Sequence, residues 1–143
     1  MDNLKDRHSF YMVEDDYLHL PGARSVLREG LKIGEYVTLY DHPDKYMKAG
    51  PNPHVINGAE KSQVFLSKSC HWKQTNSTTM TWATRVETLK QDREVWWANS
   101  EEKAAYDFEA FMSLDRLTIS SIPGWSTHCE TQWLTPLQDW KAL

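Results

Sequence analysis

Two segments in the middle of the chain, residues 62–72 and 78–88, alternate apolar and polar side chains, which is the pattern of half-buried β-strands. Both apolar sets fall on even-numbered positions, so the two strands can pair their inward residues only through a turn of odd length. A three-residue turn at 74–76 meets this condition and predicts an antiparallel hairpin with Cys70 opposite Met80 and Val64 opposite Val86. The alternation predicts burial of Val64, Leu66, Cys70, Trp72, Met80, Trp82 and Val86, and greater exposure of Ser67, Ser69, Thr79 and Thr81.

Two further segments carry helix signals. Residues 21–29 begin with proline, which suits the first turn of a helix, and Gly30 follows as a stop. A longer amphipathic helix is predicted over about residues 100–114, where Asn99 and Glu102 form a capping box. Its apolar residues recur at helical spacing and are Ala104, Ala105, Phe108, Phe111 and Met112.

The remaining short apolar runs, bounded by turn residues, complete the expected sheet. They predict strands at 9–13, 31–40, 94–98, 117–121 and 125–133. The pattern as a whole predicts one α+β domain over residues 1–143. Its sheet is expected to be twisted, mostly antiparallel and five to seven strands wide, with the 100–114 helix packed on one face.

The paired tryptophans Trp96 and Trp97 are the most informative dipeptide of the chain. In a strand their indoles project to opposite faces, so both faces of that strand require cover. The 100–114 helix can cover one face. The other is left for a short C-terminal helix, the 41–58 loop, a ligand or another subunit, which makes the pair a candidate interface or pocket.

Charge and targeting signals narrow the possible partners. The chain has 16 basic and 20 acidic residues, a formal charge of −4, without the clustered Lys and Arg that phosphate contacts require. This balance argues against a nucleic-acid partner. No apolar run approaches the roughly 18–20 residues of a bilayer span, and residues 1–8 lack the apolar region of a signal peptide. We therefore expect a cytoplasmic protein without a membrane segment.

Each cysteine stands beside a histidine, in the pairs Cys70-His71 and His128-Cys129, which resemble a split zinc site. Neighbours on a strand point to opposite faces, so both thiols would turn into the core and both imidazoles outward. One ion could not gather all four side chains. Two cysteines are also too few for a disulfide framework. We expect two buried, reduced thiols, no metal and no cofactor.

Three residues are weak candidates for acid–base chemistry. His71, His128 and Glu130 would share the polar face of the sheet if their strands lie near one another. A solvated sheet face, on which Ser, Thr and His are ordinary, explains the same residues without a site, and the sequence does not show which strands are adjacent.

The long loop at 41–58 offers a second and weaker group, His42, Asp44 and His54, as possible metal ligands. Five prolines and glycines in that loop explain its composition without a site. The chain has no glycine-rich phosphate loop, nucleophile elbow or His-Glu-x-x-His motif. Their absence counts against the common nucleotide-binding, hydrolase and zinc-protease chemistries.

Two functions remain open from the sequence. The first is a non-enzymatic protein-interaction or assembly subunit, a homo-oligomer or part of a complex, that uses an aromatic-rich sheet surface. The second is a small enzyme or small-molecule-binding protein with an aromatic-lined pocket and a histidine acid–base group. The sequence does not decide whether the protein is an enzyme.

Overall fold

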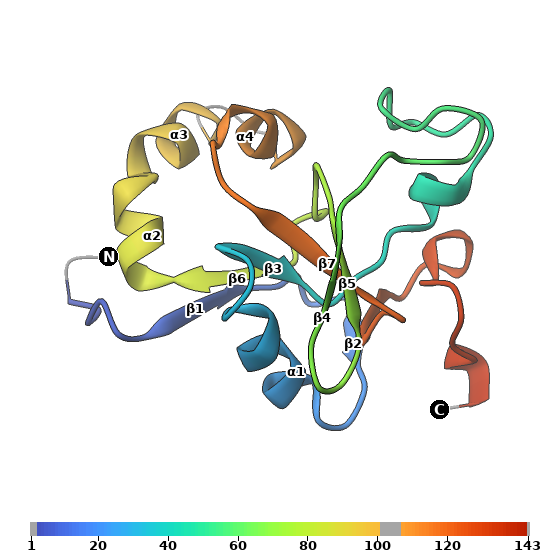
Figure 1. The fold of residues 1–143 in the computed structure, drawn as a ribbon, viewed down its shortest axis with the longest axis horizontal. Helices are drawn as coiled ribbons and strands as arrows, with labels where there is room; N and C mark the ends of the chain where they lie inside the picture. The colour runs from blue at the N-terminus through green and yellow to red at the C-terminus, as the bar shows by residue number, and fades with distance from the viewer. Residues whose placement is uncertain (1–2, 101–106, 143) are drawn as a thin grey trace.

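A computed structural model describes residues 3–100 and 107–142. Its centre is a six-stranded sheet in the order β1-β6-β3-β7-β5-β4, and a two-stranded sheet pairs β2 with β8 (Figure 1). All neighbours are antiparallel except β3 and β7, which are parallel. The α+β class and the mostly antiparallel sheet are therefore confirmed. The strands are β1 (Ser9–Met12), β2 (Tyr17–His19), β3 (Tyr36–Thr38), β4 (Val64–Leu66), β5 (His71–Gln74), β6 (Trp82–Arg85), β7 (Thr118–Ile122) and β8 (Ser126–His128).

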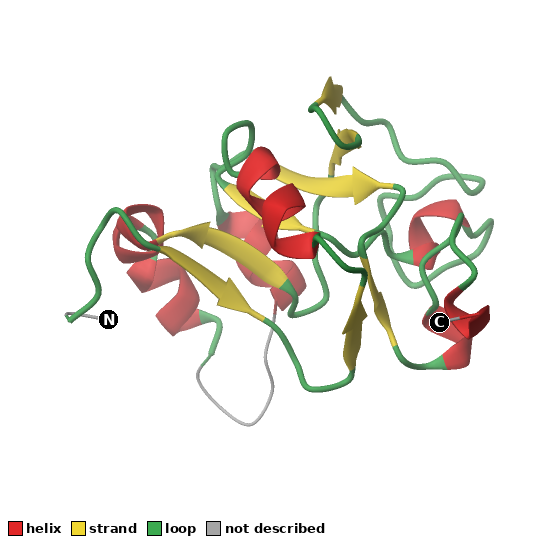
Figure 2. Cartoon of the chain, turned by 90° about the horizontal axis from the view of Figure 1, so that it is seen from below, coloured by secondary structure: helices red, strands yellow, loops and turns green. Residues whose placement is uncertain are grey.

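Helices cover both faces of the large sheet. In Figures 1 and 2, α1 lies on one side of the sheet and α2, α3 and α4 lie on the other. The described residues form four helices where one main helix was expected. Residues 101–106 of the predicted 100–114 helix lie outside the described residues. The helices are α1 (Ala23–Gly30), α2 (Val86–Gln91), α3 (Arg93–Ala98) and α4 (Asp107–Ser113), with short 3-10 turns at Pro43–Tyr46, Thr131–Trp133 and Trp140–Ala142.

The α1 face has an aliphatic core into which α1 fits closely. Its helix was predicted at 21–29, and the observed helix ends on Gly30, the predicted stop. A Cβ at Gly30 would lie 2.6 Å from atoms of both Trp72 and Val37. Glycine at this position therefore lets the helix approach the sheet closely, in addition to ending it. The buried members of this core are Ala23, Val26, Leu27, Leu31, Val37, Leu39, Cys70, Trp72, Ala83 and Ile119.

The opposite face has an aromatic core. Tyr36 and Trp82 from the sheet pack against Phe111 of α4 and Trp96 of α3. The indoles of Trp82 and Trp96 stack at 4.5 Å with an interplanar angle of 17°, and Tyr36 meets Phe111 edge-on at 5.5 Å. Offset and edge-to-face ring pairs add about 0.5–1.5 kcal/mol each to the burial of their area.

A series of side-chain hydrogen bonds and ion pairs anchors this aromatic core. The Trp96 indole N–H donates to the Tyr36 hydroxyl, which donates to Asp92, both over 2.9 Å. Arg116 then contacts Asp92 at 2.9 Å and Glu35 at 2.8 Å. The Trp96 N–H, the Tyr36 hydroxyl and the Arg116 guanidinium each therefore donate to a partner, as polar groups require on burial.

The predicted hairpin is wrong. Strand β5 pairs with β4 and β7, whereas β6 pairs with β1 and β3, so Cys70 does not face Met80. The chain leaves β5 at Gln74 and crosses the sheet through a segment in which Thr79 and Met80 both have φ of 50°. The alternation correctly marked Trp72 and Trp82 as inward, but the pattern of burial carries no information about which strand is the partner.

Further predictions of burial and of secondary structure are also wrong. Val64 and Leu66 are 60% and 71% exposed on the edge strand β4, whereas Phe65 between them packs against the aliphatic core. Thr81 is fully buried. Residues 94–98 form helix α3, and Cys129 is exposed because the predicted 125–133 strand ends at His128.

Candidate functional site

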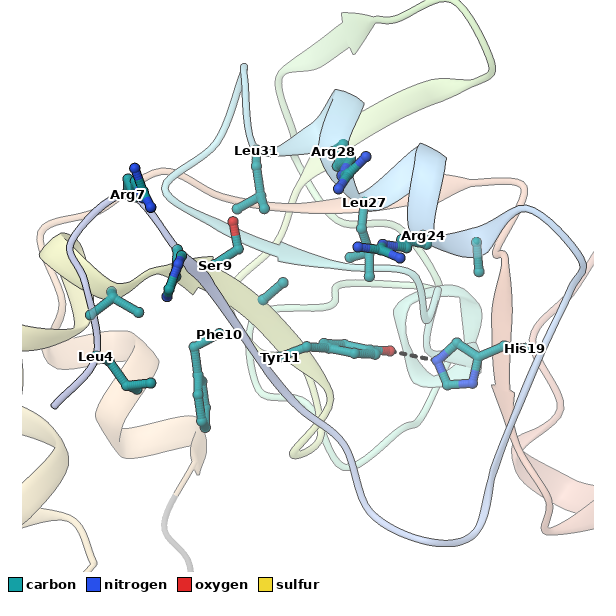
Figure 3. Close-up of a pocket in the computed structure, with 14 residues that line it drawn as sticks. Leu4, Arg7, Ser9, Phe10, Tyr11, His19, Arg24, Leu27, Arg28 and Leu31 are labelled. Carbon is teal, nitrogen blue, oxygen red and sulfur yellow. Dashed lines mark hydrogen bonds between the residues drawn. The ribbon is translucent and has the colours of Figure 1, made fainter. Parts of the chain in front are cut away.

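A groove with a cavity volume of about 930 Å³ lies between α1 and the edge strand β1 (Figure 3). Its rim carries polar and charged side chains, and its floor is apolar. We call it the arginine groove. The rim includes Arg7, His8, Tyr11, His19, Arg24 and Arg28, and the floor includes Leu27, Leu31, Ala83 and Val86.

Strand pairing and helix periodicity bring these residues together. Ser9 lies opposite Arg85 and Tyr11 opposite Ala83, so side chains of β1 and β6 reach the α1 face in pairs. Arg24 and Arg28 are four residues apart on α1 and therefore project from one side of the helix, beside its buried stripe. Figure 3 shows both arginines above the Tyr11–His19 end of the groove.

The charge of the groove contrasts with that of the chain. In the part of the chain that the structure describes, its lining includes three arginines and two histidines and no aspartate or glutamate, although the whole chain carries −4. Among residues 3–100 and 107–142, no carboxylate forms an ion pair with Arg7, Arg24 or Arg28. Three guanidinium groups without a protein counter-charge, over an apolar floor, favour an anion.

A tyrosine–histidine pair lies at the far end of the groove. The Tyr11 hydroxyl and His19 Nε2 are 2.6 Å apart, and Thr81 Oγ1 lies 3.2 Å from the same hydroxyl. Burial raises the pKa of Tyr11 and lowers the pKa of His19 from its ordinary value of 6.5. Near pH 7 the imidazole is therefore neutral, and a hydrogen bond joins the phenol oxygen to Nε2.

The acid–base candidates from the sequence do not line the arginine groove, and they belong to two different sheets or follow them. His71 is exposed on β5 of the large sheet, whereas His128 lies on β8 of the small one. His128 Nε2 is 2.9 Å from Asp16, and its Nδ1 accepts weakly from the Glu130 backbone N–H at 3.4 Å. In the described part of the chain no hydrogen bond joins His71 to either residue.

The loop candidates are also divided. His42 and Asp44 form a pair, with Nδ1 2.8 Å from Oδ1, while His54 packs against the ring of Phe108 at 5.9 Å. Within residues 3–100 and 107–142, no group of three His, Cys, Asp or Glu side chains is arranged to hold a metal ion. Cys70 is buried as predicted, and burial raises the pKa of its thiol to about 11.

A buried polar cluster lies under the 41–58 loop. Lys73 Nζ is 2.9 Å from Asp41, a carboxylate with no exposed surface, and the Tyr46 hydroxyl donates to the other oxygen of Asp41 at 2.6 Å. Lys45 is also buried, beside Glu60, and desolvation lowers the pKa of its ammonium group. These charged and polar groups pair with one another, and the cluster anchors the loop.

Trp96 and Trp97 differ in a way that the helix explains. Adjacent residues of a helix point about 100° apart, and Trp96 enters the aromatic core while Trp97 remains 66% exposed. Both line a second cavity of about 320 Å³, which we call the tryptophan pocket. Its walls are formed mainly by Phe10, Met12, Met80, Trp82, Trp96 and Trp97.

Comparisons with protein-family models, curated proteins and solved structures give no significant match to this chain. Function must therefore be inferred from the chain itself. In the ranges that the structure describes, no helix combines the length and apolar character needed to cross a bilayer.

The groove residues carried only a partial signal in the sequence. Arg24 and Arg28 are visible as a basic pair at helical spacing within the predicted 21–29 helix. Tyr11 and His19 carried none, because they lie in short segments whose mutual position depends on β1 and β2 joining different sheets.

Proposed function

We propose that this protein binds an anionic small molecule and that the arginine groove holds it. The observation that supports this proposal is the convergence of three arginines without described counter-charges on an apolar floor. Ligand sites typically combine a mostly apolar lining with a few convergent polar groups, in cavities of about 300–1,000 Å³. The groove has this composition and size.

The arrangement of the groove suggests how such a ligand would lie. Arg24 and Arg28 can each present a planar fork of donors, the geometry that matches a carboxylate or phosphate. An apolar body would then rest on Leu27, Leu31 and Ala83. In the enzymatic version of this function, the histidine acid–base group would be His19, acting with Tyr11, in place of His71 or His128.

Removing both helix arginines tests the proposal. We expect the double variant Arg24→Gln, Arg28→Gln to bind butyl phosphate at least tenfold more weakly than the unmodified protein, because two charge-assisted contacts are lost. We also expect binding by the unmodified protein to weaken between 50 and 300 mM NaCl, since salt screens exposed charges. Isothermal titration calorimetry measures both effects.

The matched control is Lys61→Gln, Lys141→Gln, which removes the same charge from exposed residues outside the groove. This variant should bind butyl phosphate as the unmodified protein does. Equal losses in the two double variants would show a general charge effect and contradict a site in the groove, as would an unmodified protein that binds no alkyl phosphate or carboxylate.

A second candidate function is protein interaction or assembly through α3. The observation in its favour is Trp97, a large apolar side chain left 66% exposed beside other aromatic residues. Tryptophan is enriched among residues that dominate interface energies, and its truncation typically weakens association by 2 kcal/mol or more. Sedimentation of the unmodified protein and of Trp97→Ala tests this function, which requires an oligomer that the variant loses.

A further inference from the structure

The arginine groove and the tryptophan pocket lie on opposite faces of the sheet but share two lining residues, Leu4 and Phe10. Strand β1 separates them. Because side chains alternate along a strand, Tyr11 faces α1 while Phe10 and Met12 face the aromatic core. Phe10 is only half-buried, and its ring lies 5.7 Å from that of Trp82.

The position of β1 leaves a way from one cavity to the other. It is an edge strand, and in the described residues no other strand pairs with its outer side. A flexible molecule in the groove could therefore pass round β1 without crossing the sheet. The surface that it would follow is formed by Leu4 and Phe10, the two residues common to both cavities.

Leu4 is held at this place by α2. The Lys90 ammonium donates to the Leu4 carbonyl at 3.0 Å and to Asp6 Oδ1 at 2.8 Å, which ties the N-terminal segment to the helix. The Leu4 side chain is 41% exposed. An apolar side chain thus remains partly open to solvent at the point where the two cavities meet.

The two cavities differ in chemistry. The groove offers guanidinium groups, whereas the pocket is walled mainly by aromatic rings and methionines, and among the described residues Arg93 and Ser100 are its only polar lining. A molecule that satisfies both has an anionic head and a long apolar tail. Methionine and aromatic side chains suit a flexible hydrocarbon, because thioethers adapt to its shape.

We infer that the ligand is a single-chain anionic amphiphile, with its head in the arginine groove and its hydrocarbon tail passing over Leu4 and Phe10 into the tryptophan pocket. This inference rests on the proposed function, because the groove must first bind the head. It extends that function by giving the ligand a hydrocarbon tail, a path for the tail over Leu4 and Phe10, and the tryptophan pocket as the place where the tail binds.

The test compares butyl, octyl and dodecyl phosphate, each below its micelle concentration. Affinity should rise roughly three- to fourfold for each methylene that enters the pocket, as expected for burial of a CH₂ group. Dodecyl phosphate should change tryptophan fluorescence, whereas butyl phosphate should not. Trp97→Ala, which opens the pocket and does not line the groove, should flatten the dependence on chain length and leave butyl phosphate binding unchanged. Leu4→Trp, which obstructs the path, should flatten the same dependence.

Leu137→Ala is the matched control, since it truncates a side chain that is 75% exposed and lines neither cavity. It should retain the full chain-length dependence. If Trp97→Ala and Leu4→Trp also retain it, the tail does not reach the pocket and the inference fails, while butyl phosphate binding would still support the groove. Equal affinities for dodecanol and dodecyl phosphate would also overturn the inference, because the anionic head would then add nothing to the binding of the tail. If the unmodified protein binds no butyl phosphate, the proposed function itself fails.

Discussion

Replacing Trp82 with alanine is expected to lower the free energy of unfolding by about 3–5 kcal/mol, the usual cost of truncating a large buried aromatic residue. Trp82 is 2% exposed, stacks on Trp96 and meets Tyr36 at 5.3 Å. The cavity left by alanine would remove packing contacts from both the sheet and helix α3. Urea unfolding followed by circular dichroism measures the change, provided that the slope with denaturant stays constant.

Two controls sharpen this result. Trp82→Phe should cost less than the alanine variant by at least about 1.5 kcal/mol, since it keeps a ring and gives up an indole N–H that has no partner among the described residues. Trp97→Ala should change the stability by less than about 1 kcal/mol, because Trp97 is mostly exposed. Similar losses for Trp82→Ala and Trp97→Ala would contradict the aromatic core as described.

Lys73→Met is expected to destabilise the protein by about 3–5 kcal/mol, because it leaves a buried carboxylate without its cation. The Asp41 side chain has no exposed surface and that of Lys73 has 8%, so water cannot replace the lost partner. Adding Asp41→Asn to Lys73→Met removes the orphaned charge, and the double variant should recover at least about 1 kcal/mol.

Urea unfolding of both single variants and the double variant completes this cycle. Lys61→Met is the matched control, since Lys61 is exposed, and it should cost less than about 0.5 kcal/mol. A loss near the control value for Lys73→Met would mean that Asp41 does not depend on the ion pair.

Local patterns in the sequence determined much of the secondary structure and of the core. The helix ending on Gly30 was predicted from its proline and glycine signals, and strands near 9–13 and 117–121 were predicted from short apolar runs. Trp72 and Trp82 were correctly predicted as inward. These features depend on side-chain periodicity and on the conformations that proline and glycine allow, which neighbouring residues set.

Periodicity failed where a short apolar run fits two structures. The Glu94–Ala98 run was assigned to a strand, yet it belongs to the helix α3, from which Trp96 packs on the same aromatic core as Leu89 of α2. Runs of five residues do not separate a period of 2.0 from one of 3.6, so the packing of Trp96 on Trp82 decided the outcome.

Only the tertiary structure decided which strands are neighbours and therefore where a site could form. Backbone hydrogen bonds between strands are the same for every sequence, so alternation in residues 62–72 could not reveal that β5 pairs with β7 instead of β6. The arginine groove depends on the same kind of information. Its rim comes from residues 7–11, His19 and α1, segments that are separated along the chain and are placed together only by the pairing of β1 with β6 and the packing of α1 on the sheet.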